Sequence, residues 1–158
     1  MPSDQARNPL APLLPPAAIR LHAHADDWRD AIRQAGDLLV ASGASTTAYT
    51  DQMIQAVERY GPYIVIAPGF ALAHARASEA VLRTGMSWVS LDEPVRFGHD
   101  KNDPVKIVLG LASHGHEEHL AALQLVAALA TDPTRMDALE AATTPEELLK
   151  LMNQGEDK

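Results

Sequence analysis

The stretch that most constrains the fold is VKIVLGLA, residues 105–112, because it is apolar on both faces of a strand. Val105, Ile107 and Leu109 alternate toward one face, while Val108 and Ala112 belong to the other. Apolar side chains on both faces require cover on both sides. The sequence therefore predicts an α/β fold, in which this strand lies centrally in a mixed, mostly buried sheet with helices on both faces.

Other elements follow from residue periodicity and from turn residues. Short apolar, β-branched runs predict strands at 63–67 and 85–91. Helical spacing of apolar residues predicts helices that begin at Asp26 or Asp27, at Thr47, near Glu117, at Asp132-Pro133 and at Thr144-Pro145. Gly43 is expected to end the first of these helices and Gly61-Pro62 the second. The second helix is expected to place Tyr49, Met53, Ala56 and Tyr60 on one face.

The length of 158 residues suits a single domain with one core. Residues 1–18 are rich in proline and predict a flexible arm, with the alternative that LAPLL folds over the core. The domain is expected to span residues 19–153, followed by a solvated tail at 154–158.

Composition excludes several classes of protein. The net charge is −8 with no basic stripe, which argues against binding to nucleic acid. There is no cysteine, so disulfides and thiolate metal sites are excluded. No apolar run approaches the roughly 20 residues that span a bilayer, and no signal peptide is evident. A cytoplasmic protein is expected.

Histidines concentrate after the central strand, where His114, His116 and His119 lead into a helix. Sites in α/β sheets gather beyond the carboxyl ends of strands, and a helix N-terminus favours an anion such as a phosphoryl group. Two alternatives stay open for this run. The three side chains are ordinary exposed loop histidines, or they bind a metal together with Glu117 or Glu118.

His74 lies just after an apolar run and a Pro68-Gly69 break. The surrounding residues match neither a phosphate-cradling Gly-x-x-x-x-Gly-Lys loop nor a Gly-x-Ser-x-Gly elbow. A neutral imidazole here can act as base, ligand or nucleophile. The alternative is a partly buried histidine bonded to the backbone.

Four segments in order resemble the enzyme IIA domain of the bacterial sugar phosphotransferase system (PTS). They are GPYIVIAPGFALAHAR (61–76), TGMSWVSLDEPVRFG (84–98), NDPVKIVLGLAS (102–113) and HLAALQLVAALA (119–130). The resemblance covers about residues 26–152. It is to the mannitol/fructose type, and most of all to the ascorbate-specific IIA proteins.

The resemblance implies the mannitol-type IIA fold and a phosphotransferase component with a phosphohistidine intermediate. His74 would accept a phosphoryl group from the carrier HPr and pass it to a IIB component, for sugar uptake through a membrane IIC permease. His119 would be the second family histidine, and Arg59 the family's phosphate-binding arginine, with a solvated helix-end arginine as its alternative. No cofactor and no metal are implied.

The chain departs from the family where Ala73 replaces the usual proline before the acceptor. We expect His74 to lie exposed in a shallow depression, with Phe70 and Leu72 in its apolar rim. Two other functions remain open: a regulatory IIA-like protein that uses the same phosphohistidine, and a histidine-rich metal-binding protein. The oligomeric state is left open, with a homodimer as one option.

Overall fold

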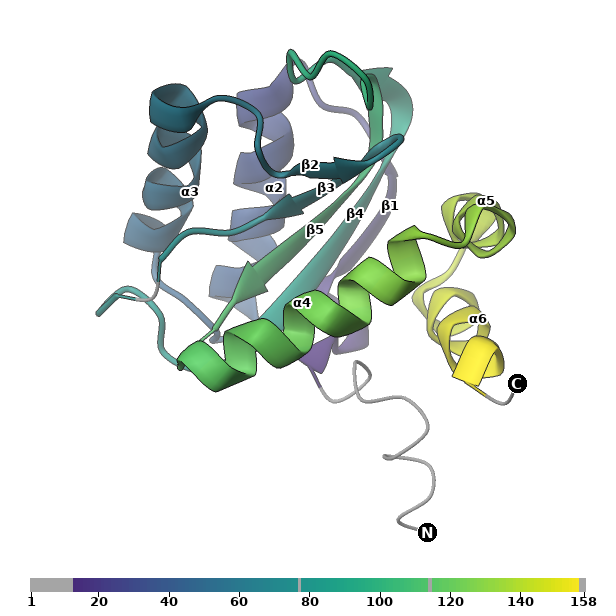
Figure 1. Cartoon of the computed structure of the whole chain (residues 1–158). Helices are drawn as coiled ribbons and strands as arrows, with labels where there is room; N and C mark the ends of the chain where they lie inside the picture. The colour runs from purple at the N-terminus through teal and green to yellow at the C-terminus, as the bar shows by residue number, and fades with distance from the viewer. Residues whose placement is uncertain (1–12, 77, 114, 157–158) are drawn as a thin grey trace, which may run out of the picture.

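The computed structural model describes residues 13–76, 78–113 and 115–156, and in them one mixed sheet runs in the order β1-β4-β5-β3-β2 (Figure 1). Its strands are β1 (Ile19–Ala23), β2 (Val65–Ala67), β3 (Phe70–Ala73), β4 (Gly85–Val95) and β5 (Val105–Ala112). β5 lies between β3, to which it is parallel, and β4, to which it is antiparallel. The expectation that residues 105–112 form a central strand is confirmed.

Helices cover both faces of the sheet, as Figure 1 shows. They are α2 (Trp28–Ala41), α3 (Thr47–Tyr60), α4 (His116–Ala130), α5 (Pro133–Ala141) and α6 (Pro145–Glu156), with a short 3₁₀ helix, η2, at Pro16–Ala18. α2 packs on β4 and β5, whereas α4 and α6 contact the sheet from the other side. The α/β fold with helices on both faces is therefore confirmed. No helix in the described part of the chain has both the length and the apolar character needed to cross a membrane.

Most helix ends are where their residues predict them. Asp27 caps α2 by accepting a hydrogen bond of 2.8 Å from the Asp30 N–H, and Gly43 follows the helix with φ of 85°. Asp132 caps α5 in the same way. α3 begins at Thr47 as expected, but Thr47 does not cap it: Thr46 occupies the N-cap and forms no side-chain cap bond.

β3 is not among the strands expected from the sequence, which were placed at 63–67, 85–91 and 105–112. β2 and β3 pair in antiparallel fashion around Pro68-Gly69, where Gly69 has φ of 74°. The left-handed backbone at this point suits glycine. The signal was present in the sequence, since a Pro-Gly pair between two apolar runs is typical of a hairpin.

The ends of the chain extend the expected domain. Leu14 is 1% exposed and belongs to the core, so the described part of the N-terminal segment packs on the domain. This is the alternative that the sequence left open for LAPLL. Residues 1–12 of the expected arm lie outside the described residues. At the other end α6 runs to Glu156, so residues 154–156 of the expected tail are helical.

Candidate functional site

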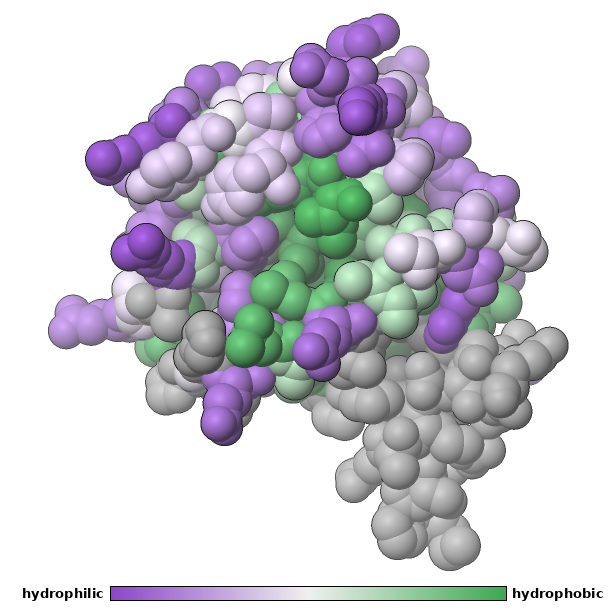
Figure 2. Space-filling view, in the orientation of Figure 1, coloured by the Kyte–Doolittle hydropathy of each residue, from purple (hydrophilic) through white to green (hydrophobic). Residues whose placement is uncertain are grey.

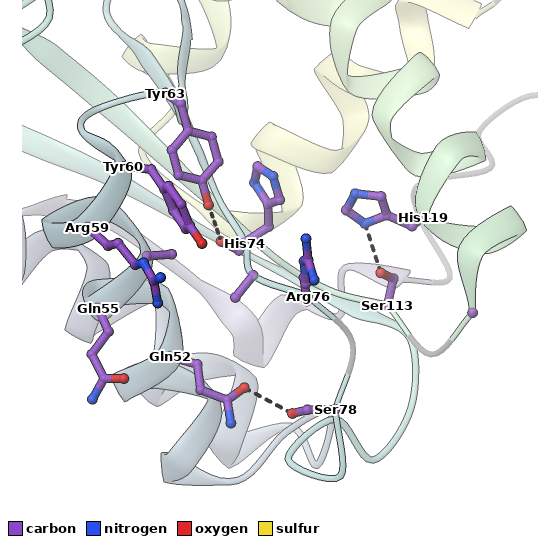
Figure 3. A pocket seen from close by; sticks show the side chains of 13 residues that line it. Gln52, Gln55, Arg59, Tyr60, Tyr63, His74, Arg76, Ser78, Ser113 and His119 are labelled. Atoms are coloured by element: carbon purple, nitrogen blue, oxygen red, sulfur yellow. Dashed lines mark hydrogen bonds between the residues drawn. The ribbon is translucent and has the colours of Figure 1, made fainter.

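Two histidines meet at one edge of the sheet (Figure 3). β3 and β5 are parallel, with Ala73 paired to Gly110, so their carboxyl ends lie at the same edge. His74 follows β3 directly, and the chain after β5 enters α4, whose first turn carries His119. The two ring centroids are 5.5 Å apart, with the ring planes tilted by 46°. The structure thus brings together the two residues that the sequence analysis predicted as a pair.

A backbone hydrogen bond fixes the protonation pattern of His74. Its Nδ1 lies 2.7 Å from the carbonyl oxygen of Leu72. A carbonyl only accepts, so Nδ1 carries the proton of the neutral ring and Nε2 carries the lone pair. Burial of the half-exposed ring lowers the pKa of His74, and the neighbouring His119 lowers it further, against the Leu72 bond, which raises it. The side chain is therefore both bonded to the backbone and suited to be a nucleophile.

His119 is oriented by a serine that the sequence analysis overlooked. The Ser113 hydroxyl lies 2.9 Å from Nδ1 of His119, and Ser113 itself is buried. Gly115 occupies the N-cap of α4 and offers no side-chain bond to the first helical N–H groups. These N–H groups carry partial positive charge, which favours an anion near His119.

A cavity of about 840 Å³ opens beside the two rings. Its described lining is Gln52, Gln55, Ala56, Arg59, Tyr60, Tyr63, His74, Ala75, Arg76, Ser78, Ser113, Gly115 and His119. No Asp or Glu is among these residues, although the chain as a whole has a net charge of −8. With two arginines and no carboxylate among its described residues, this lining suits an anionic ligand.

Two arginines reach this cavity from different elements. Arg59 lies in the last turn of α3, where the sequence placed it, with its guanidinium carbon 5.5 Å from the centroid of the Tyr60 ring. Arg76 follows His74 by two residues, and Figure 3 shows its side chain between the two histidines in that view. Neither forms an ion pair with a carboxylate of the described residues. Arg76 was not among the site residues expected from the sequence, where its spacing of two residues from His74 was the available signal.

The predicted rim of the depression is wrong. Phe70 and Leu72 are 0% exposed, because β3 is covered on both faces and buries its side chains. Tyr60 (67% exposed) and Tyr63 (43% exposed) form the aromatic edge of the cavity instead. The ring of Tyr63 stands edge-on to His74 at 5.5 Å between centroids, and its hydroxyl donates to the His74 carbonyl at 3.4 Å.

Further large apolar side chains are exposed outside the cavity lining. Figure 2 shows hydrophobic residues gathered near the centre of the face that carries β2 and α4. Ile66 on β2 and Leu120 on α4 are large hydrophobic side chains that remain exposed. Together with Tyr60 and Tyr63 they make up what we call the apolar margin of the site.

The other histidines whose side chains the structure describes lie outside the cavity. His22 bonds to the Ala142 carbonyl, His24 to Asp26, and His99 accepts backbone N–H bonds within its own loop. His114 lies outside the described residues, as do the side chains of His116 and Glu118. The metal hypothesis for residues 114–119 therefore falls largely on side chains that the structure does not describe. Among described side chains, the group able to hold a metal is His24, Asp92 and Glu93, which is exposed and separate from the cavity.

Comparison with known proteins agrees on one family. Residues 12–155 match the model described as "Phosphoenolpyruvate-dependent sugar phosphotransferase system, EIIA 2". The ascorbate-specific PTS system EIIA component of Escherichia coli K12 is 40% identical over 140 residues, which cover 87% of this chain and 90% of that protein.

Two solved structures show the same fold. The mannitol-specific cryptic phosphotransferase enzyme IIA of Escherichia coli is 28% identical with a TM-score of 0.82, covering 92% of this chain and 99% of that one. The enzyme IIAMTL of Escherichia coli, solved in complex with phosphorylated enzyme IIBMTL, is 26% identical with a TM-score of 0.79, covering 90% of this chain and 99% of that one.

Proposed function

Because this chain belongs to the EIIA 2 family of the phosphoenolpyruvate-dependent sugar phosphotransferase system, we propose that it carries a phosphoryl group on His74 between two proteins of a sugar uptake system. The donor is the carrier HPr and the acceptor is a IIB component, which serves a membrane IIC permease. The protein is thus a phosphotransferase component with a phosphohistidine intermediate, and its place of action is the cytoplasm.

The observation that carries this proposal is the state of the His74 ring beside His119. The lone pair on Nε2 attacks phosphorus, the new N–P bond forms, and the bond from phosphorus to the donor breaks. The proton stays on Nδ1, where the Leu72 carbonyl 2.7 Å away holds it. Passing the group to IIB reverses these events at the same nitrogen. The ring must be neutral before the attack, because only then does Nε2 carry a lone pair, and the lowered pKa of His74 supports this.

Charge around the cavity supports the transferred group. A phosphoryl group brings negative charge, which planar guanidinium groups and helix N-terminal N–H groups stabilise. Arg59 and Arg76 line the cavity with no described carboxylate beside them, and His119 lies across from the acceptor. We assign to these three residues the binding of phosphoryl oxygens. Positioned charges of this kind stabilise the transferred group electrostatically, while His74 forms the covalent bond to phosphorus.

Both partner proteins would use the apolar margin around the site. A phosphocarrier must release each partner after transfer, so its interfaces are of modest area. Exposed Tyr60, Tyr63 and Leu120 are side chains of the type that such contacts bury. A similar enzyme IIA is known in complex with phosphorylated enzyme IIB, which supports a IIB partner for this chain.

The direct test is phosphotransfer in vitro. The protein is incubated with phosphoenolpyruvate, enzyme I and HPr, and acid-labile phosphate on the chain is measured. We expect labelling of the unmodified protein, none of His74→Ala, and slowed labelling of His119→Ala. His99→Ala, which alters a histidine in a distant loop, serves as the matched control and should be labelled normally. Full labelling of His74→Ala would refute the assignment.

The sugar is proposed from the relatives. A relative with 40% identity is an ascorbate-specific EIIA component, so we propose an ascorbate-like sugar acid as the transported class. Deleting the gene in its host should abolish ascorbate uptake and spare mannitol uptake. Normal ascorbate uptake in the deletion strain, combined with intact His74 labelling in vitro, would instead favour a regulatory role.

A further inference from the structure

A buried tyrosine hydroxyl joins the two segments that carry the histidines. Tyr49 lies in the first turn of α3 and is 0% exposed. Its hydroxyl donates to the carbonyl of Leu111 at 2.7 Å and accepts from the N–H of Ala75 at 3.0 Å. Ala75 follows His74 directly, and Leu111 precedes Ser113, the partner of His119, by two residues.

We propose that Tyr49 is a positioning residue for phosphoryl transfer, which fixes the separation between His74 and His119 through these two backbone contacts. The inference rests on the proposed function, because it concerns the alignment of the same two rings. Tyr49 is not among the described residues that line the cavity, so it acts through the backbone and does not touch the phosphoryl group.

The position of these contacts explains why a side chain is needed there. The ladder between β3 and β5 ends at the pair Ala73–Gly110. His74 and Ala75 therefore lie beyond the last strand pairing, where no backbone hydrogen bonds of the ladder connect the segment after β3 to β5. The Tyr49 hydroxyl connects the two segments just past this point, since it bonds to Ala75 after β3 and to Leu111 in β5.

The chemistry of the hydroxyl suits a permanent bridge. It has one proton, which goes to the closer carbonyl of Leu111, while its lone pair accepts from Ala75. The Ala75 carbonyl, at 3.2 Å, is a second acceptor within reach. Burial raises the pKa of Tyr49 to about 12, so the hydroxyl keeps its proton at any pH at which the protein works.

The test is Tyr49→Phe, which keeps the ring in the core and removes only the bridge. Transfer depends steeply on alignment, since a misplacement of about 1 Å can cost about 100-fold in rate. We expect the rate constant for phosphorylation of His74 by phospho-HPr to fall at least about tenfold, with little change in the KM for HPr.

The matched control is Ser90→Ala. Ser90 is a buried hydroxyl that accepts the His22 N–H at 2.8 Å, so its loss removes a similar bond at the β1–β4 pairing. We expect its transfer rate to equal that of the unmodified protein. Nitrogen-15 NMR of the His74 ring separates a positioning role from general destabilisation. The ring signals and their titration should shift in Tyr49→Phe and remain unchanged in Ser90→Ala.

The possible outcomes separate the two proposals. If the unmodified protein is not phosphorylated, the proposed function fails. If it is phosphorylated and Tyr49→Phe reacts at the same rate with unshifted His74 signals, only the role of Tyr49 fails.

A measurement on the unmodified protein covers the case in which Tyr49→Phe does not fold. In the unmodified protein, the Ala75 amide hydrogen should exchange with solvent deuterium as slowly as the amide hydrogens of β3. Fast exchange at Ala75 would overturn the inference.

Discussion

At the scale of single residues, the surroundings of His74 decide its chemistry. The family's proline before the acceptor is Ala73 in this chain, and a proline would fix φ at that point. Here Ala73 is buried and paired with Gly110. The strand ladder therefore holds the backbone that leads to His74, in the place where a proline would restrict φ.

The first prediction concerns the pH dependence of His74. Its pKa lies below the ordinary value of 6.5, because burial and His119 disfavour the protonated ring. Lowering the pH through 6.5 should leave the lone pair on Nε2 intact, and phosphorylation should decline only once the pH falls through the lowered pKa. NMR titration of the imidazole in the unphosphorylated protein measures this directly. A His74 pKa above 6.5 would contradict the prediction.

The same shift has a consequence for stability. The unfolded chain binds a proton at His74 near its ordinary pKa, while the folded chain binds it only at lower pH. The unfolded state thus holds more protons between these two values, so this residue lowers the free energy of unfolding as the pH falls through that window. Above the window His74 makes no pH-dependent contribution.

The second prediction concerns the arginines. Arg59→Gln and Arg76→Gln should each slow phosphorylation by about tenfold or more, since a hydrogen bond to a charged group is worth about 1.5–3 kcal/mol. Arg33→Gln, an exposed change on α2, is the control and should leave the rate unchanged. Measuring the initial rate from phospho-HPr decides the matter. If both cavity variants match Arg33→Gln, the phosphoryl group is held by other residues.

Much of the site was predictable from the sequence. The rest could not be predicted, and the reason is physical. The resemblance placed His74, His119 and Arg59, all of which line one cavity. Ser113 and Tyr63 act through contacts that depend on the separation and orientation of segments. A single sequence carries no direct record of such contacts.

At the scale of elements, periodicity identified long elements better than short ones. The eight residues of β5 were predicted with the correct bounds, whereas the four residues of β3 are too short to show a period. Tyr60 was expected on the same face as Tyr49 but is largely exposed. It is the last residue of α3, next to Gly61, and its side chain forms the edge of the cavity instead of packing in the core.

The third prediction tests the contact between α2 and α3. A Cβ added to Gly36 would lie 2.6 Å from Cγ2 and 2.8 Å from Cβ of Thr50, and would also meet its hydroxyl oxygen. Gly36→Ala should therefore lower the free energy of unfolding by about 1–3 kcal/mol, despite the better helix propensity of alanine. Urea denaturation measures the change. Adding Thr50→Ala should restore part of the loss, and a stabilised Gly36→Ala protein would show that the helices separate freely.

At the scale of the whole molecule, the core extends beyond residues 26–152, to which the resemblance was expected to be confined, and the family model likewise matches from residue 12. The resemblance began near residue 26, yet Leu14 and Ala18 are buried in the same core as the sheet. The proline-rich composition of residues 1–18 suggested a flexible arm. Such a sequence shows no helical or strand periodicity, so it does not reveal that Leu14 packs in the core.

The fourth prediction follows from that anchor. Leu14→Ala should reduce the free energy of unfolding by about 2–5 kcal/mol, as a fully buried leucine does when truncated. Leu82→Ala, at an exposed position, should change it by no more than about 0.5 kcal/mol. Thermal or urea unfolding of both variants provides the comparison. Equal stabilities would mean that residues 13–18 do not contribute to the folded unit.

The parallel register of β3 and β5 also limits where the chain tolerates a change in length. One residue inserted in either strand would advance its end by about 3.3 Å and turn the following side chain to the opposite face, which separates the two imidazoles. The turns at 68–69 and 98–104 precede these strands, so extra residues there keep the count from ladder to histidine. Inserted peptides should be tolerated, and natural insertions found, in these two turns, because the distance between His74 and His119 stays unchanged.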